Sequence, residues 1–483
     1  MAHGPTNSHD LDGEPELART LGPWHLIALG IGAIIGAGIF VITGHAAASY
    51  SGPGVVISFA IAGLGCLFAG LCYGEYASMI PVAGSAYTYT YATLGRFLAW
   101  IIGWNLVLEY LAACSTVAVG WSGYFNDFMG SFLGMPIPEA FASAPIALQG
   151  FGQIGLTGAV INLPAVALCA LVTCVLMIGV HMSASFNNLM VIVKLVIVVV
   201  VIAAGLPYVV PANHTPFIPP NTGEFGSFGW TGVFRATGVI FFAYIGFDAV
   251  SVAAQEAKNP QRDVPLGILG SLVICTVLYI LMSYVLTGLA PYSELNVAHP
   301  VSMAVASIPE TAWLTPFVNV GAIVGLASVV LVLMLGQTRI FFAMSHDGMI
   351  PPMFGRVHPK YRTPYLGTLV TGVCAGTLAG FLPLDILGEL VSIGTLAAFV
   401  MVCAGIMVLR VQRPNAVRPF RTPFVWIVAP LGIAMCLFMM AFLPLDTWLR
   451  LVVWTLIGLA IYGLYSTKHA RPSRWHIAEN PAE

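Results

Sequence analysis

The sequence predicts an all-α integral membrane protein with twelve transmembrane helices. Of its 483 residues, 58% are hydrophobic and only 8% are charged, and the mean hydropathy is +0.89. Soluble globular chains carry roughly a quarter charged residues, so lipid must be the main solvent for this protein. Long apolar runs such as 189–204 lack the alternation of polar and apolar residues that membrane β-barrels need, which excludes the barrel class.

Apolar windows recur along nearly the whole chain at the length that a membrane-spanning helix needs, about 20 residues. We expect spans at residues 24–50, 54–79, 96–122, 160–180, 187–208, 231–256, 266–290, 316–342, 365–382, 387–409, 424–444 and 448–466. The flanking residues 1–23 and 467–483 are expected to be cytosolic tails. No stretch is left for a separate soluble domain.

Basic residues indicate the orientation, because Lys and Arg concentrate in cytoplasmic loops. With the N-terminus inside, the internal segments hold 15 of the 18 basic residues: Arg19, Arg96, Lys258, Arg262, Arg339, Arg356, Lys360, Arg362, Arg410, Arg413, Arg418, Arg421, Lys468, Arg471 and Arg474. The predicted external loops at 123–159, 209–230, 291–315 and 383–386 contain none. We therefore expect a multi-pass protein of the plasma (inner) membrane with both termini in the cytosol.

The first predicted helix carries four glycines close to its middle, at positions 30, 32, 36 and 38. Glycine is costly for helix continuity, and interrupted backbone inside a membrane must face protein or a cavity. Close helix packing through small residues is one interpretation. Local unwinding, which would free backbone N–H groups to bind an anion, is the other.

The sixth predicted helix favours unwinding, since Phe241 to Asp248 also contains a glycine near mid-span. Asp248 is placed to cap a second half-helix. Helices 1 and 6 each open a block of five helices, 24–208 and 231–409, and five is odd, so the second block would cross the membrane in the opposite sense. Paired interruptions in inverted halves indicate the central site of a transporter.

Two unwound helices would together suit a zwitterionic ligand. The N–H groups of Gly36, Ala37 and Gly38 would bind a carboxylate, whereas freed carbonyls would bind an ammonium group. The carbonyls expected to do so belong to Ile35, Phe242, Ala243 and Ile245. An α-amino acid fits this description, and by pattern alone another small zwitterion fits equally well.

Charged residues within the membrane usually have a function or a partner. Glu109 lies near the middle of helix 3, where burial favours its protonated form, so a proton could arrive there with the substrate. Lys194 on helix 5 would act as a fixed cation against the break in helix 1, or carry the proton itself. A static ion pair between the two is the structural alternative. Glu75 is expected to reach water by snorkelling, and Arg235 to be an interfacial anchor.

Several function classes are excluded or disfavoured. The chain contains no His-Glu-x-x-His, no Gly-x-Ser-x-Gly and no P-loop, so neither an enzyme nor a fused ATPase is predicted. We expect no cofactor and no metal site. The net charge of −2 predicts no nucleic-acid partner.

Four stretches make the chain recognisable: 32–40 in helix 1, 81–87 after helix 2, 241–248 with 256–260 around helix 6, and 336–344 at the end of helix 8. On these, the chain resembles the amino acid–polyamine–organocation superfamily over about residues 20–465. Within that superfamily it is similar to bacterial members of the cationic amino acid transporter family.

The resemblance implies a LeuT-like fold with a five-plus-five inverted repeat, with helices 11 and 12 (424–466) outside it, and substrate bound between helices 1, 3, 6 and 8. It also implies that Lys194 stands where sodium-coupled relatives hold a sodium ion, and that Glu109 is linked to proton coupling. Met334 and Phe242 then favour a small or apolar substrate side chain over arginine.

We therefore predict a secondary transporter that imports amino acids with protons by alternating access. An exchanger or a cationic amino acid or polyamine transporter from the same superfamily is the nearest alternative. A twelve-helix transporter with two parallel halves and a membrane-embedded enzyme are more distant ones. The sequence leaves open whether a small membrane-protein subunit or a second copy of the chain is a partner.

Overall fold

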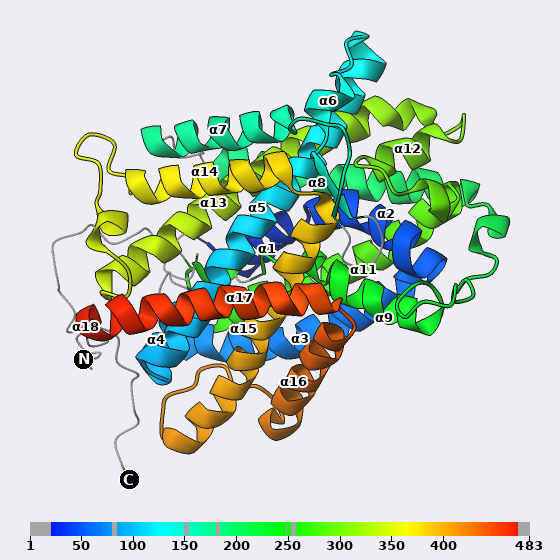
Figure 1. The fold of residues 1–483 in the computed structure, drawn as a ribbon. Helices are drawn as coiled ribbons and strands as arrows, with labels where there is room; N and C mark the ends of the chain where they lie inside the picture. The colour runs from blue at the N-terminus through cyan, green and yellow to red at the C-terminus, as the bar shows by residue number, and fades with distance from the viewer. Residues whose placement is uncertain are drawn as a thin grey trace.

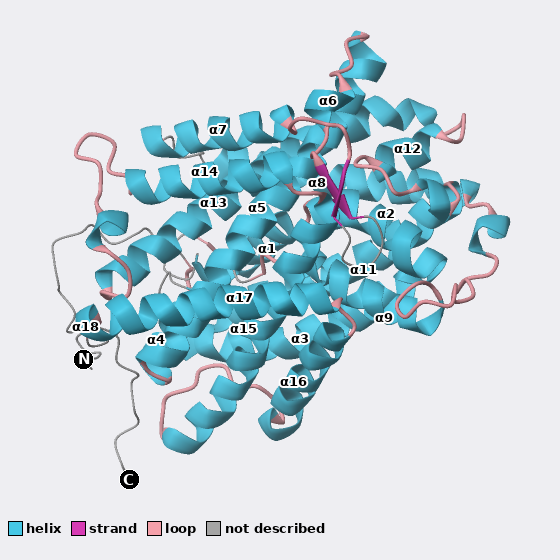
Figure 2. Ribbon diagram, in the orientation of Figure 1, coloured by secondary structure: helices cyan, strands magenta, loops and turns pink. Residues whose placement is uncertain are grey.

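The computed structural model describes residues 21–79, 85–148, 154–179, 184–247, 249–252 and 257–471. Helix dominates these ranges (Figure 2), and their only sheet is a short antiparallel hairpin in which β1 (Ile146–Leu148) pairs with β2 (Ile154–Leu156). The expected tails 1–23 and 467–483 lie mostly outside the described residues, and so does Asp248.

Seven helical stretches in the described chain are long and apolar enough to cross a membrane: Gly38–Met79, Arg96–Leu133, Leu189–Tyr208, Pro260–Leu289, Ala312–His346, Leu384–Gln412 and Leu445–His469. Four shorter apolar helices accompany them: Pro23–Ile34, Leu163–Ile178, Tyr365–Phe381 and Val425–Ala441. The protein is therefore a mostly helical, multi-pass membrane protein, as its composition predicts.

The first half of the chain contains, in order, α1 (Pro23–Ile34), the π-helix η1 (Gly38–Ile42), α2 (Thr43–Ala46), the π-helix η2 (Ala47–Ser51), the 3-10 turn η3 (Gly52–Gly54), α3 (Val55–Met79), α4 (Ser85–Thr93), α5 (Arg96–Leu133), α6 (Glu139–Ala142), the β1–β2 hairpin, α7 (Leu163–Ile178), α8 (Ala184–Gly205) and the 3-10 turns η4 (Leu206–Tyr208) and η5 (Pro211–His214).

The second half contains α9 (Gly229–Ile240), the 3-10 turn η6 (Phe241–Tyr244), α10 (Ala249–Val252), α11 (Pro260–Leu289), the 3-10 turn η8 (Tyr292–Glu294), α12 (Pro300–Ala306), the 3-10 turn η9 (Ala312–Leu314), α13 (Thr315–His346), the 3-10 turn η10 (Pro352–Gly355), α14 (Tyr365–Phe381), α15 (Leu384–Gln412), α16 (Val425–Ala441), α17 (Leu445–Ile461), the π-helix η11 (Tyr462–Ser466) and α18 (Thr467–His469).

Local sequence explains where several helices begin and end. Proline occupies the first turn of α1, α7, α11, α12 and α13, where its missing N–H costs nothing. The Asn162 side chain accepts a hydrogen bond from Ala165 N (3.2 Å) and so caps the start of α7. Gly179 ends α7 in the left-handed conformation, at φ +75.

Helix α5 is longer than expected: it runs to Leu133 rather than stopping near residue 122. Its extra turns carry Asp127, which accepts hydrogen bonds from Ser302 of α12 (2.7 Å) and from Asn319 of α13 (2.8 Å). The apolar window missed these turns because polar tertiary contacts hold them. Gly134, at φ +67, ends the helix.

The long helices run side by side in one bundle (Figure 1). Helices α7 and α14 lie together along one edge, and α16 packs against α15 at another. The central helix α5 packs against both α13 and α15, while α11 packs against α1 and α3. The core therefore surrounds the N-terminal helix α1, and the breaks in the chain lie inside it.

Candidate functional site

The first break separates α1 from the helical segment that starts with η1. The backbone of Ile35 is extended, with ψ 103, and helical geometry returns at Ala37. N–H groups in the first turn of a helix have no partner within that helix. The break therefore directs the N–H groups of Gly36, Ala37 and Gly38 towards whatever lies at this helix end.

The second break follows α9. The chain tightens into η6 at Phe241, becomes extended at Ile245 with ψ 140, and turns at Gly246 with φ +113. Only glycine adopts that backbone conformation without strain. Both helices predicted to be interrupted are thus interrupted, which favours unwinding over simple close packing.

The two breaks cross each other at glycines. A Cβ placed on Gly38 would lie 2.3 Å from Ala243 Cα, and a Cβ placed on Gly246 would lie 2.7 Å from Ala33 O. A side chain at either position would overlap main-chain atoms of the other segment. The glycines therefore allow the two unwound stretches to touch directly.

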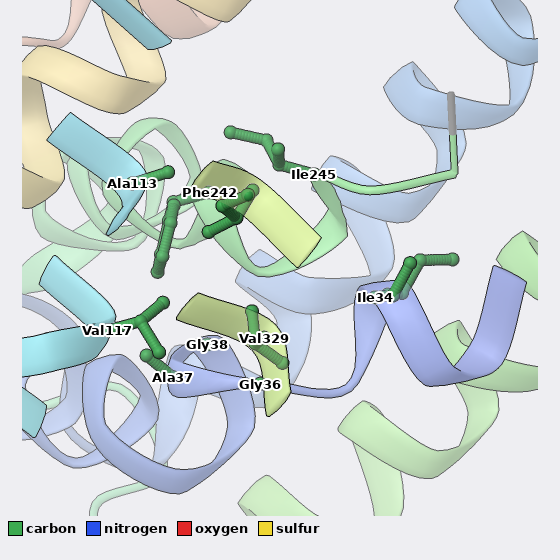
Figure 3. A pocket seen from close by; sticks show the side chains of 11 residues that line it. Ile34, Gly36, Ala37, Gly38, Ala113, Val117, Phe242, Ile245 and Val329 are labelled. Atoms are coloured by element: carbon green, nitrogen blue, oxygen red, sulfur yellow. The ribbon is translucent and has the colours of Figure 1, made fainter. Parts of the chain in front are cut away.

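A cavity lies where the breaks meet, with about 280 Å³ of space not filled by protein atoms. Its wall comes from four helical regions: Ala33, Ile34, Gly36, Ala37 and Gly38; Ala113 and Val117 of α5; Phe242 and Ile245; and Val329 and Leu333 of α13. Figure 3 shows the side chains of Val117, Phe242 and Val329 gathered around this space. None of these lining residues is charged.

Five of the residues predicted to bind a ligand line the cavity: Gly36, Ala37, Gly38, Phe242 and Ile245. Ile35, Ala243 and Met334 are not among its lining residues. Met334 is buried, and its neighbour Leu333, together with Val329 one turn away, faces the cavity instead. The sequence-based prediction identified the correct helix, α13, but not which of its faces lines the cavity.

The carbonyls expected to be free are bonded to other groups of the protein. Lys194 Nζ donates to Gly32 O and to Ile35 O, the latter at 3.0 Å. Phe242 O accepts from Ile245 N at 3.1 Å. A carbonyl oxygen has two lone pairs, so Ile35 and Phe242 each retain one for a ligand. The expected contact between Lys194 and the first break is present.

Tyr279 on α11 connects the two breaks, and sequence reasoning missed it. Its hydroxyl lies 2.8 Å from Ile34 O and 2.8 Å from Ala243 O. One hydroxyl proton is thus shared between carbonyls of both unwound stretches. The available sequence signal was a tyrosine within the apolar run of α11. The structure shows that Tyr279 is fully buried, and a buried hydroxyl needs a polar partner.

We expect Tyr279→Phe to weaken substrate binding about fivefold to tenfold, since a net hydrogen bond is worth about 1 kcal/mol. Equilibrium binding to the purified protein measures the effect. Tyr284→Phe on the same helix is the matched control, because Tyr284 is partly exposed and does not contact either break. Equal behaviour of the two variants would contradict a role for Tyr279 at the breaks.

Glu109 is buried on α5, one helical turn from Ala113 of the cavity wall. Lys194 contacts the carbonyls of the first break and packs beside Gly325 of α13. No ion pair involves Lys194 among the described residues. The static Glu109–Lys194 pair is therefore not what holds these helices together.

Ion pairs connect both broken helices to α15, at positions several residues away from the breaks themselves. His45 Nε2 lies 3.2 Å from Asp385, and Arg235 Nη2 lies 3.7 Å from Glu389. Arg235 also stands over the Tyr50 ring, 4.6 Å from its centroid. The expectation that Arg235 is an interfacial anchor was wrong, because its side chain is largely buried among these partners.

At the opposite end of the bundle, Glu75 of α3 holds the loop after α15. Arg410 donates to both of its carboxylate oxygens, at 2.9 and 2.8 Å, and Thr422 N donates at 2.8 Å. Arg418 lies 3.2 Å away. The snorkelling expected for Glu75 is wrong: the residue is fully buried because two arginines neutralise it in place.

Comparison with known proteins gives consistent matches. A family profile described as amino acid permease matches residues 21–464. The branched-chain amino acid permease BcaP of Bacillus subtilis is 47% identical over 95% of each chain, and the methylthioribose transporter of the same organism is 46% identical over 94% of this chain and 95% of that relative. The vacuolar cationic amino acid transporter 4 of Arabidopsis thaliana is 37% identical over 84% of this chain and 66% of that relative.

These matches cover both breaks and every helix that lines the cavity, and they confirm the resemblance read from the motifs. They describe transporters rather than enzymes. The chain belongs to the amino acid permease family of the amino acid–polyamine–organocation superfamily.

Proposed function

We propose that this permease imports amino acids with branched aliphatic side chains, driven by protons. The observation that carries the proposal is the cavity itself: backbone groups of two broken helices on one side, and the apolar side chains of Val117, Val329 and Leu333 on the other. Backbone dipoles suit the α-carboxylate and α-ammonium groups, which every amino acid shares. The apolar wall selects the side chain.

The side-chain preference follows from solvation. A guanidinium or ammonium group in this cavity would face Val117, Phe242 and Leu333 without a carboxylate among the described lining residues, and burying an unpaired charge is very costly. An aliphatic side chain instead gains about 0.8 kcal/mol for each CH₂ group buried. The similar permease named for branched-chain amino acids supports the same substrate class.

Methylthioribose is a second candidate substrate, because the relative named as its transporter is almost equally similar. Its thioether end would suit the apolar wall. It carries neither of the charges that the N–H groups of Gly36 to Gly38 and the opposing carbonyls would recognise. Competition between methylthioribose and leucine for the purified protein separates the two candidates.

Architecture and orientation are part of the proposal. We propose twelve crossings, in which helices 1–5 (24–208) and helices 6–10 (231–409) run in opposite senses. Two observations support this architecture: the first helix of each block is broken, and the two breaks cross each other at Gly38 and Gly246. The distribution of the basic residues supports a cytosolic location for both termini, and the bacterial relatives support the plasma membrane. In this orientation the His45–Asp385 and Arg235–Glu389 pairs lie towards the outer side, and alternating access would break them when the protein opens outward.

We propose Glu109 as the proton site, and the Glu109→Gln variant tests coupling. Glutamine keeps the shape but cannot release a proton. Leucine uptake into proteoliposomes by wild type should rise about tenfold or more when a pH gradient, acidic outside, is imposed. The variant should bind leucine normally and lose this stimulation.

Glu310→Gln is the matched control, since Glu310 lies in an exposed loop. Uptake by wild type that requires amino acid on the opposite side and ignores the pH gradient would instead identify an exchanger. A Glu109→Gln variant that still responds fully to the gradient would move the proton site elsewhere, and Lys194 would be the next candidate.

A further inference from the structure

Helices α5 and α13 pack against each other in a register that glycine contacts define. A Cβ added to Gly336 of α13 would lie 2.5 Å from the ring of Tyr110 on α5, and a Cβ added to Gly103 of α5 would lie 3.2 Å from Met344 of α13. Moving along α5 towards its N-terminal end therefore means moving along α13 towards its C-terminal end. The two helices are antiparallel.

The same register continues through the cavity wall. Ala113 of α5 and Leu333 of α13 both line the cavity. Residues four positions apart share one face of a helix, so Glu109 lies one turn below Ala113, and Gln337 lies one turn below Leu333. Glu109 and Gln337 are therefore placed in the same layer, directly beneath the cavity floor and on the cytosolic side in the proposed orientation.

The Gln337 side chain is fully buried, and neither its Oε1 nor its Nε2 has a hydrogen-bond partner among the described residues. Leaving a buried polar group unsatisfied is costly, and a primary amide carries two donor hydrogens and one acceptor oxygen. The amide therefore points to a polar occupant of this layer.

Asn105 presents a second amide of the same kind, one turn beyond Glu109 on α5. Its Nδ2 donates to Ile101 O at 3.0 Å, whereas its Oδ1 has no partner among the described residues, and the side chain is only 4% exposed. It lines a small hollow between α5 and α17. Two buried, incompletely bonded amides thus flank Glu109, one opposite it and one a turn below.

We propose that Gln337 and Asn105 hold internal water around Glu109, and that this water forms the path by which the Glu109 proton leaves for the cytosol. Internal water typically makes two to four hydrogen bonds to buried polar groups that lack other partners. An amide both donates and accepts, so it can hold water next to the carboxyl in either of its protonation states. The inference rests on the proposed coupling role of Glu109.

Other charged groups on the helices packed against α5 are engaged elsewhere. Arg410 of α15 pairs with Glu75 at 2.8 Å, and Glu389 of α15 accepts from Thr447 at 2.6 Å. Arg339 of α13 is exposed. On α4, the Tyr87 hydroxyl donates to Asp347 at 2.9 Å. Glu109 is the carboxyl that lies one turn from Asn105 on α5 and in the same layer as Gln337 of α13.

The test compares two transport modes of the full-length protein in proteoliposomes. Net uptake of leucine down a pH gradient requires the proton to leave on the inside, whereas exchange of labelled for unlabelled leucine at equal pH does not. We expect Gln337→Leu to reduce net uptake about tenfold while leucine binding and exchange stay within twofold of wild type. We expect Gln337→Asn, which keeps an amide, to recover most of the net uptake.

Gln412→Leu, at the exposed end of α15, is the matched control and should behave as wild type. Gln337→Leu with undiminished net uptake would overturn the inference, and so would an equal loss of uptake, exchange and binding, which would indicate a structural role. The Glu109→Gln variant distinguishes failure of the proposed coupling site from failure of the proposed water path. If that variant still couples to protons, the proposed coupling site fails. If it uncouples while Gln337→Leu transports normally, the water path alone fails.

Infrared difference spectra of the carboxyl region provide a readout that a structural role would not move. On adding leucine, the band that disappears in Glu109→Gln belongs to Glu109. Gln337→Leu should shift that band, since the water held against the carboxyl is lost, and Gln412→Leu should leave it in place. An unshifted band in Gln337→Leu would contradict water contact with Glu109.

Discussion

The Gly38→Ala variant is expected to lose leucine uptake by about 100-fold, because small displacements in a binding site have effects of that size. The added Cβ would lie 2.3 Å from both Cα and Cβ of Ala243, so the breaks would have to move apart. The displacement separates the N–H groups of the first break from the carbonyls of the second. Even the smallest side chain is too large at this position, and Gly38→Val should be at least as severe.

Gly376→Ala is the matched control for that variant. Gly376 lies within helix α14, and its added Cβ would meet its nearest neighbour at an ordinary 3.6 Å. Equilibrium binding of labelled leucine to the purified protein, with monodispersity checked by size-exclusion chromatography, measures both variants. A Gly38→Ala protein that is well folded and binds leucine normally would show that the ligand site lies elsewhere.

Lys194→Met is the second large effect that we expect, with leucine binding weakened by about 100-fold. The ammonium group donates to Gly32 O and Ile35 O, and hydrogen bonds to charged groups are worth about 1.5–3 kcal/mol each. Methionine matches the length of lysine without the donor, so both carbonyls would lose their partner. The first break would then lose the anchor that aims its N–H groups at the cavity.

Lys360→Met, in the exposed loop before α14, provides the comparison. It removes the same charge from the chain without touching the breaks, and leucine binding should be unchanged. Leucine-binding isotherms for Lys194→Met and Lys360→Met measure this difference in affinity. Similar affinities would mean that the lysine contact to the first break does not support the site.

The sequence was sufficient to predict both breaks, and the physical reason is specific. Glycines clustered at mid-span, as at Gly36 and Gly38, weaken a continuous helix, and interrupted backbone within a membrane must face protein or a cavity. The contact of Lys194 with the first break could also be predicted, because a buried ammonium needs acceptors and unwound carbonyls provide them.

The rest could not be read from the sequence because it depends on helix rotation and on distant partners. Met334 was predicted to line the site, but Leu333 lines the cavity instead, because the sequence alone does not say which face of α13 meets the cavity. Glu75 and Arg410 are 335 residues apart, so no local pattern reveals their pairing. Tyr279 likewise acts across the bundle rather than along its own helix.

The central claim is that main-chain groups of the two breaks recognise both charges of an amino acid while an apolar wall selects its side chain. Competition against labelled leucine by valine, lysine, 3-methylbutylamine and 4-methylpentanoate tests this claim most directly. The two analogues keep the leucine side chain but lack the carboxylate and the amine, respectively.

Valine should compete within about tenfold of leucine, whereas both analogues should bind about 100-fold more weakly, since each lacks one of the two charges that the broken helices bind. Lysine should also bind about 100-fold more weakly, because its side-chain ammonium would be buried without a partner against the apolar wall. Either analogue competing as well as leucine would contradict recognition of the zwitterion by the broken helices.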